Sequence, residues 1–153
     1  MTRGRYYEEL EVGAVYEHAV RRTVSEMDNV LFSALTHNPQ PLHLDEEFAR
    51  ESIFGTRVVN SMFTLGLVVG ISVGETTLGT TLANLGFEEV VFPAPVRHGD
   101  TIHVETEVVA KRESRSRPET GIVELEHRGF NQAGELVCRC RRQALMLRRT
   151  ASA

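Results

Sequence analysis

The chain is poor in the residues that build covalent or metal-linked frameworks. Its 153 residues include two cysteines, five prolines and no tryptophan. Cys138 and Cys140 stand two positions apart in an alternating stretch, so their side chains lie on the same side of a strand. A disulfide does not comfortably join positions i and i+2 of one strand. No second cysteine pair exists to complete a zinc site. We therefore expect reduced thiols, a reducing compartment and no metal.

Long apolar segments and an excess of positive charge are missing as well. The most apolar stretch, residues 62–73, is shorter than a membrane-spanning helix and is interrupted by glycines. The first residues lack the apolar core of a secretory signal. The formal net charge of -4 gives no sign of a strongly basic face for nucleic acid. We expect a cytoplasmic protein that binds neither membranes nor nucleic acid.

What is present fits one ordinary domain. The length suits a single core, and the hydrophobic share of 41% is that of a folded protein. We expect one domain over residues 1–150 and a frayed end at 151–153.

The first half of the sequence mixes strand and helix signals. Residues 15–23 alternate loosely and predict a first strand. Ser25 and Asp28 are spaced like a capping box, and apolar residues follow at helical spacing. Prolines make residues 36–44 unsuited to regular structure, and a short helix is expected over 46–51.

A third helix is predicted over residues 60–75. It is apolar nearly all round, which is typical of a helix buried in the middle of a domain. Gly66, Gly70 and Gly74 recur every four residues and form a stripe where another element can pack closely. We expect a sheet to wrap around this helix.

The second half is rich in strand signals. Alternating stretches cover residues 81–92, 101–111, 121–131 and 136–148, with turn residues between them and a polar loop at 112–120. Short strands that follow one buried helix indicate an α+β domain with an antiparallel sheet.

Three stretches resemble the MaoC-like hydratase and dehydratase family: THNPQPLHLD (36–45), FGTRVVNSM (54–62) and FPAPVRHGDTIHVETEV (92–108). The resemblance implies a single hot-dog domain, an antiparallel sheet wrapped around one central helix, that forms a homodimer or higher homo-oligomer. It further implies a lyase that hydrates 2-enoyl-CoA thioesters or dehydrates the 3-hydroxy forms. Coenzyme A then enters as part of the substrate, with no separate cofactor.

The resemblance also implies roles for particular residues. His43 stands on the family's catalytic histidine, whereas Asn38 stands where the family has an aspartate and Gln40 where it has asparagine. His37 replaces a glycine. These departures move proton transfer onto His43, alone or together with Asp45 or His37, because an amide such as Asn38 orients water but is no base at neutral pH.

The start of the central helix carries the second part of the implied site. Ser61 stands on the glycine whose backbone N–H is the family's oxyanion donor, and Asn60 replaces the preceding histidine. Ser61 keeps that N–H, and the helix dipole adds to its effect on a developing enolate.

The loss of the aspartate has a physical interpretation. A substrate acyl group with its own carboxylate would be repelled by an aspartate at position 38, and Arg57 is a candidate partner for such a carboxylate. The pattern is similar to hydratases of C5 dicarboxylic thioesters, itaconyl-CoA or mesaconyl-CoA. Simpler interpretations remain: Arg57 as a surface cation, Asn38 as a turn cap, His37 as a wall residue and Asp45 as a helix cap.

Two other functions stay open. Hot-dog domains also host thioesterases, which favour an acidic residue on the central helix, and Glu75 comes late in that helix. A non-catalytic acyl-thioester-binding or regulatory subunit would also explain the changes at Asn38 and Gln40.

Overall fold

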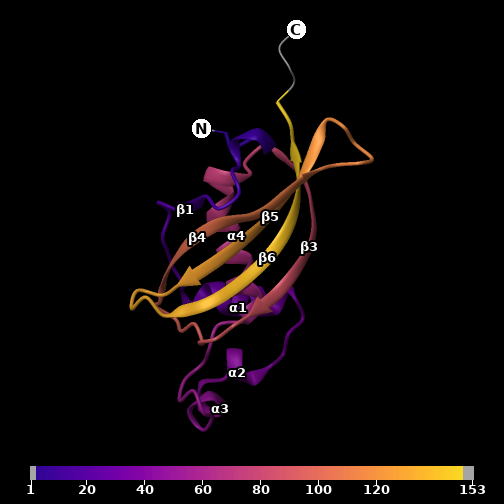
Figure 1. Cartoon of the computed structure of the whole chain (residues 1–153). Coiled ribbons are helices and arrows are strands. Elements are labelled where there is room, and N and C mark those ends of the chain that lie inside the picture. The colour runs from indigo at the N-terminus through magenta and orange to yellow at the C-terminus, as the bar shows by residue number, and fades with distance from the viewer. Residues whose placement is uncertain (1–2, 150–153) are drawn as a thin grey trace.

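The computed structural model describes residues 3–149. An antiparallel sheet and the helix α4 (Ser61–Thr76) make up the body of the protein (Figure 1). The strand order is β1-β4-β5-β6-β3, and β2 also pairs with β4. The expected α+β hot-dog architecture is confirmed. The end expected to fray, residues 151–153, lies outside the described residues. The bounds are β1 (Val15–Glu17), β2 (Arg22–Thr23), β3 (Thr81–Val91), β4 (Thr101–Glu113), β5 (Thr120–Phe130) and β6 (Leu136–Leu147).

The strands of the second half follow their predicted ranges closely, whereas the predicted first strand is divided. β1 pairs Glu17 with Glu105, and β2 pairs Arg22 with Ile102. From Glu17 to Arg22 the chain advances five residues, whereas their partners on β4 are three residues apart. The segment between β1 and β2 therefore contains two extra residues, which interrupt the pairing with β4. The prediction of one strand over residues 15–23 was wrong for this reason.

One face of α4 packs on the sheet. Leu65, Val68 and Ile71 form a core with Cys138 and Cys140, which are free and fully buried. Val68 lies so close to β5 that a Cβ on Gly129 would come within 2.4 Å of its Cγ2 atom.

The opposite face of α4 is open, which corrects the prediction of a helix buried all round. Gly66, Gly70 and Gly74 are exposed, and a Cβ added at any of them would meet no atom within 4 Å among residues 3–149. The stripe packs against no other element of the described part of the chain, because the sheet covers one side of the helix and stops at β3.

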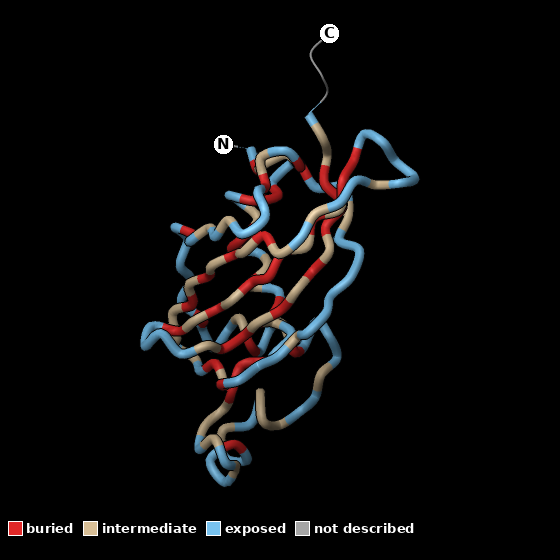
Figure 2. Tube along the Cα trace, in the orientation of Figure 1, coloured by how far each residue is buried: buried red, intermediate tan, exposed pale blue. Residues whose placement is uncertain are grey.

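Strand β3 is the exposed edge of the sheet. It pairs with β6 on one side, and nearly all of its residues are exposed, as the pale blue trace along β3 in Figure 2 shows. Its exposed apolar side chains include Leu82, Leu85, Phe87 and Val91.

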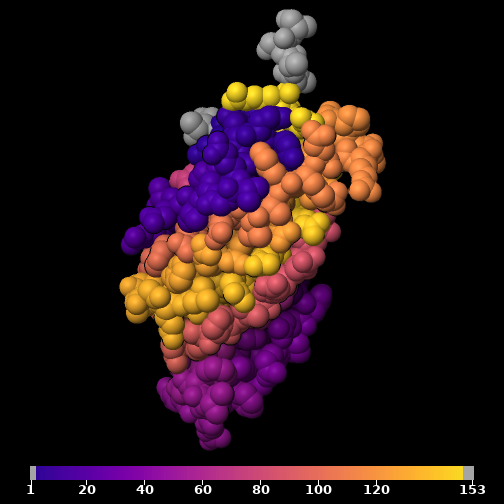
Figure 3. Space-filling model, in the orientation of Figure 1, coloured from indigo at the N-terminus to yellow at the C-terminus, as the bar shows by residue number. Residues whose placement is uncertain are grey.

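Three helices form a lobe at one end of the sheet (Figure 3). They are α1 (Glu26–Leu35), α2 (Pro41–Leu44) and α3 (Glu46–Arg50). The predicted capping box is confirmed, since Ser25 Oγ accepts from the Asp28 N–H at 3.2 Å and Asp28 Oδ2 accepts from the Ser25 N–H at 2.8 Å. The predicted helix over 46–51 is confirmed as α3, with Asp45 accepting at its N-terminus.

Residues 41–44 correct the prediction that 36–44 has no regular structure. They form the single turn α2, with Pro41 as its first residue. A proline is tolerated there because the first N–H of a helix has no intrahelical acceptor.

A buried chain of polar side chains lies under α4. Arg142 Nε donates to His127 Nε2, and His127 Nδ1, Thr106 Oγ1 and His18 Nε2 follow at 2.8 Å steps. His18 Nδ1 then contacts Glu75 at 2.8 Å. Because arginine only donates, a neutral His127 carries its proton on Nδ1 and donates it to Thr106 Oγ1, and because a carboxylate only accepts, His18 Nδ1 donates to Glu75.

Candidate active site

His43 lies in α2, where the turn that begins at Pro41 presents it to the segment before α4. Its Nδ1 atom is 2.9 Å from the carbonyl oxygen of Val58. A carbonyl only accepts, so Nδ1 donates, and the neutral ring keeps a lone pair on Nε2. The structure thus leaves His43 with the atom that a proton acceptor needs.

Ser61 is the first residue of α4. Its backbone N–H has no acceptor among residues 3–149, whereas the next N–H, that of Met62, is taken by Asn60 Oδ1 at 3.0 Å. An unpaired N–H at the N-terminus of a helix of this length attracts negative charge.

A cavity of about 400 Å³ brings His43 and Ser61 together. Thr64 is the third polar residue on its wall, and no Asp, Glu, Lys or Arg side chain lines it among the described residues. The remaining wall is apolar: Leu42, Phe54, Val58, Val59, Phe92, Pro93, Ala94, Pro95, Val96 and Val137. The arrangement places one proton acceptor and one backbone donor beside space for an apolar group.

Asn60, whose predicted contact with substrate stays a prediction, is buried directly before Ser61. Its Oδ1 caps α4, and its own N–H donates to Asn29 Oδ1 at 2.9 Å. The structure therefore gives Asn60 a part in holding the helix start.

Asn29 and His98 are site residues that the sequence reasoning missed. Asn29, fully buried in α1, contacts the carbonyl oxygens of His43 and Val58 at 3.1 Å each and His98 Nε2 at 3.0 Å. Burial, followed by the positive charge of Arg57, lowers the pKa of His98 and favours the neutral ring that accepts this bond. An asparagine at a helical position gives no sequence signal of such a role.

Three other predicted residues follow the end of α1 and are not among the residues that line the cavity. His37 has a φ of 54°, and its N–H and that of Asn38 close the helix by bonding to Ala34 and Ser33. Asn38 Oδ1 accepts from the N–H of Gln40 at 3.1 Å, so it caps the turn. Gln40 is exposed just before α2. Their predicted contacts with substrate stay predictions.

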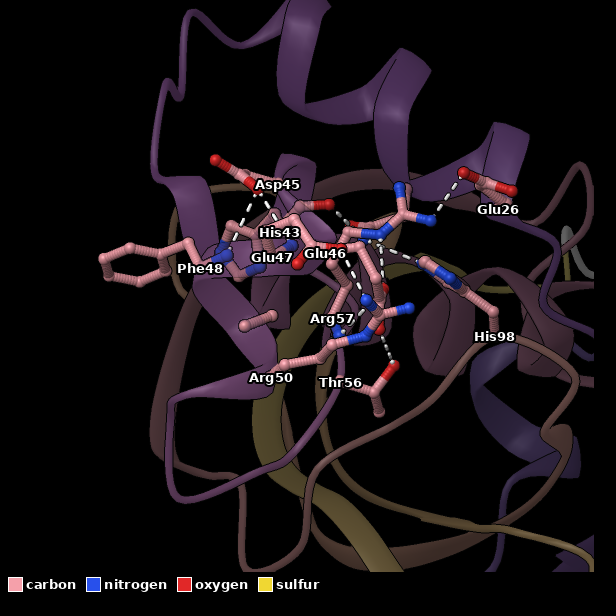
Figure 4. A network of polar contacts seen from close by, with 12 residues as sticks. Glu26, His43, Asp45, Glu46, Glu47, Phe48, Arg50, Thr56, Arg57 and His98 are labelled. Atoms are coloured by element: carbon pink, nitrogen blue, oxygen red, sulfur yellow. Dashed lines mark hydrogen bonds and ion pairs between the residues drawn. The ribbon is translucent and has the colours of Figure 1, made fainter.

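Arg57 is held by two carboxylates from the lobe (Figure 4). Its Nε donates to Glu46 at 2.9 Å and its Nη2 to Glu26 at 2.6 Å. Hydrogen bonds to Glu46 and then Glu26 raise the pKa of Arg57. Its predicted role as a clamp for a substrate carboxylate stays a prediction, and in this arrangement the guanidinium ties α1 to α3.

The family assignment follows from comparison with known domains. The MaoC like domain matches residues 8–129, which is most of the chain. The chain belongs to the MaoC-like family. Within that family it is 34% identical to a mesaconyl-CoA hydratase from Cereibacter sphaeroides over 98% of this chain, which spans 43% of the length of that relative. It is also 34% identical to an (R)-specific enoyl-CoA hydratase from Aeromonas caviae, with 83% of this chain and 88% of the relative covered.

Solved structures of this family share the fold. A MaoC-like dehydratase from Rhodospirillum rubrum superposes with a TM-score of 0.86 at 34% identity, covering 97% of this chain and all of the other. Within the described part of the MaoC-like chain, no helix has the length and apolar character to cross a membrane. Residues 3–149 hold no group of three His, Cys, Asp or Glu side chains arranged for a metal ion.

Proposed function

We propose that this protein is a hydro-lyase that adds water to, or removes it from, positions 2 and 3 of an acyl-CoA thioester. The observation that carries the proposal is the shared cavity, whose wall includes both His43, with an Nε2 atom left to accept a proton, and Ser61, whose N–H has no acceptor among residues 3–149. Relatives that are named hydratases of CoA thioesters support the reaction class.

The proposed steps need no group beyond these residues and water. His43 Nε2 takes a proton from water while the water oxygen bonds to C3, and the electron pair of the double bond moves toward the thioester carbonyl. The N–H of Ser61 binds the oxygen on which negative charge develops. The imidazolium then returns a proton to C2, which completes the addition. Coenzyme A takes part as the carrier of the acyl group.

We propose a C5 dicarboxylic acyl group, mesaconyl or itaconyl, as the preferred substrate. The neutral amide of Asn38 and the absence of carboxylates from the described cavity wall avoid repulsion of a second carboxylate. The likeness to a mesaconyl-CoA hydratase over 98% of the chain supports the same choice. Arg57 is already paired with Glu26 and Glu46. We therefore expect neutral hydrogen-bond donors to bind the second carboxylate of the substrate.

The test is hydration of crotonyl-, mesaconyl- and itaconyl-CoA, followed by loss of enoyl-thioester absorbance and by the mass of the product. We expect kcat/KM to be higher for a dicarboxylic thioester than for crotonyl-CoA. Asn38→Asp keeps the oxygen that accepts from Gln40 and should reverse this preference. Faster turnover of crotonyl-CoA by the wild type would overturn the acyl assignment, and binding without any turnover would favour a non-catalytic subunit.

We propose further that two copies of the chain pair through β3. The exposed edge and the apolar side chains of Leu82, Leu85 and Phe87 are the kind of surface that a second strand covers. Light scattering should give twice the chain mass, and Leu85→Lys should shift the protein to a monomer. The two buried free thiols support placement in the reducing cytoplasm.

A further inference from the structure

Asn29 is the buried polar residue where the parts of the site meet. It stands on the inner face of α1, with no exposed surface. A buried carboxamide without hydrogen-bond partners would destabilise the fold. The hydrogen bonds of Asn29 are therefore what makes its burial favourable. Its oxygen accepts the N–H of Asn60. Its nitrogen shares two hydrogens among three acceptors, the carbonyl oxygens of His43 and Val58 and the Nε2 atom of His98, and these contacts fix the orientation of the amide.

The nitrogen of Asn29 acts on His43 through the backbone. Nδ2 lies 3.1 Å from the Val58 carbonyl oxygen, the same oxygen that accepts from His43 Nδ1, and 3.1 Å from the carbonyl oxygen of His43 itself. The amide of Asn29 therefore contacts both residues of this pair, Val58 at the accepting oxygen and His43 at its backbone carbonyl. With the Val58 carbonyl held in place, the proton of the ring stays on Nδ1 and the lone pair stays on Nε2.

The oxygen of Asn29 acts on the start of α4. Oδ1 accepts the N–H of Asn60 at 2.9 Å, so the peptide before Ser61 has its donor engaged while the N–H of Ser61 has none among residues 3–149. The same carboxamide thus sets the position of the proton acceptor and of the oxyanion donor.

We propose that Asn29 is a positioning residue that aligns His43 Nε2 and the Ser61 N–H for the reaction. Asn29 itself stays out of the cavity wall and contacts no substrate. The effect on turnover rests on the proposed hydro-lyase function, whereas the effect on the tautomer of His43 is independent of it.

Two substitutions test the proposal. Asn29→Asp keeps the oxygen toward Asn60 and removes the donor toward Val58 and His43, and Asn29→Ser offers a smaller variant if the aspartate prevents folding. Asn131→Asp is the matched control, because Asn131 is also buried but serves the turn between β5 and β6. ¹⁵N spectra of the histidines report the tautomer of His43, assigned with His43→Gln.

We expect either Asn29 variant to lower kcat by about 10²-fold with little change in KM, since a small misplacement of reacting groups has that effect. We also expect His43 to lose its single Nδ1–H tautomer, and Asn131→Asp to change neither. The proposal is overturned if folded Asn29 variants keep the tautomer and kcat, or if Asn131→Asp lowers kcat equally. If the wild type hydrates no thioester, the proposed function fails and the tautomer alone decides this proposal.

Discussion

His43 Nδ1 and the Val58 carbonyl oxygen lie 2.9 Å apart, and this contact decides what His43 can do. It assigns the ring proton to Nδ1 and leaves Nε2 as the accepting atom of a histidine that lines the same cavity as Ser61. The histidine is oriented by a backbone carbonyl from the segment before α4. Orientation of the base therefore does not depend on the aspartate that Asn38 replaces.

Ser61→Pro should remove the oxyanion donor and leave α4 intact. Proline is favoured at the first position of a helix, and Asn60 has an extended ψ of 125° that suits the residue before a proline. We expect kcat to fall by about 10²- to 10³-fold, the usual effect of losing one such donor. Ser61→Ala, which retains the N–H, should keep most of kcat. Equal losses in both variants would show that the hydroxyl matters and the N–H does not.

His37→Gly should stabilise the protein. His37 has a φ of 54°, a conformation that costs a residue with a Cβ atom about 1 kcal/mol more than glycine. We expect a free energy of unfolding higher by up to that amount in urea titrations, with unchanged kinetic constants. A several-fold rise in KM would instead support the predicted contact between His37 and substrate.

Thr106→Val should destabilise the fold by interrupting the buried polar chain. The change preserves shape but leaves His18 Nε2 and His127 Nδ1 without their partner, at about 1–3 kcal/mol for an unsatisfied buried group. Chemical unfolding measures the loss. Thr101→Val is the control, because its hydroxyl bonds to Thr23 at the exposed surface and its removal should change stability by less than about 0.5 kcal/mol. Similar losses in both would contradict the importance of the chain.

Stability should fall as the pH drops below about 6.5. Burial, followed by the charge of Arg142, lowers the pKa of His127 well below its usual value, so the unfolded chain binds a proton that the folded chain rejects. The free energy of unfolding is therefore highest above the unfolded pKa and declines toward acid, by up to about 1.4 kcal/mol per pH unit for one histidine. Urea titrations between about pH 7.5 and about pH 5 measure this slope. His127→Gln should make it shallower, and an unchanged slope would assign it to other groups.

The sequence was sufficient for the architecture because the patterns behind it are local. Ser25 and Asp28 specify a helix start, and alternation specifies β4, β5 and β6, so these elements were predicted close to their observed bounds. The exposed side of α4 was not predicted, because the same pattern of apolar residues and glycines is found on a helix face that packs against the chain's own sheet and on one that is exposed. The prediction that residues 36–44 have no regular structure was wrong for a different reason. A proline breaks a helix from within but is tolerated at its first position, where Pro41 stands in α2.

The site was predictable where a residue acts through its own position in a motif. His43 and Ser61 were predicted on that basis and line one cavity. Asn29 was not predictable, since its role arises from contacts with residues 14 to 69 positions away. The engagement of Arg57 by Glu26 and Glu46 depends in the same way on how the helices of the lobe pack.

The most direct test of the central claim is the rate of hydration of an enoyl-CoA thioester by the wild type and by His43→Gln. The account predicts turnover by the wild type and a fall in kcat of about 10²- to 10⁴-fold in the variant, with the thioester still bound, because the general base is gone. Equal rates in the two proteins, or no turnover of any enoyl thioester by the wild type, would contradict it.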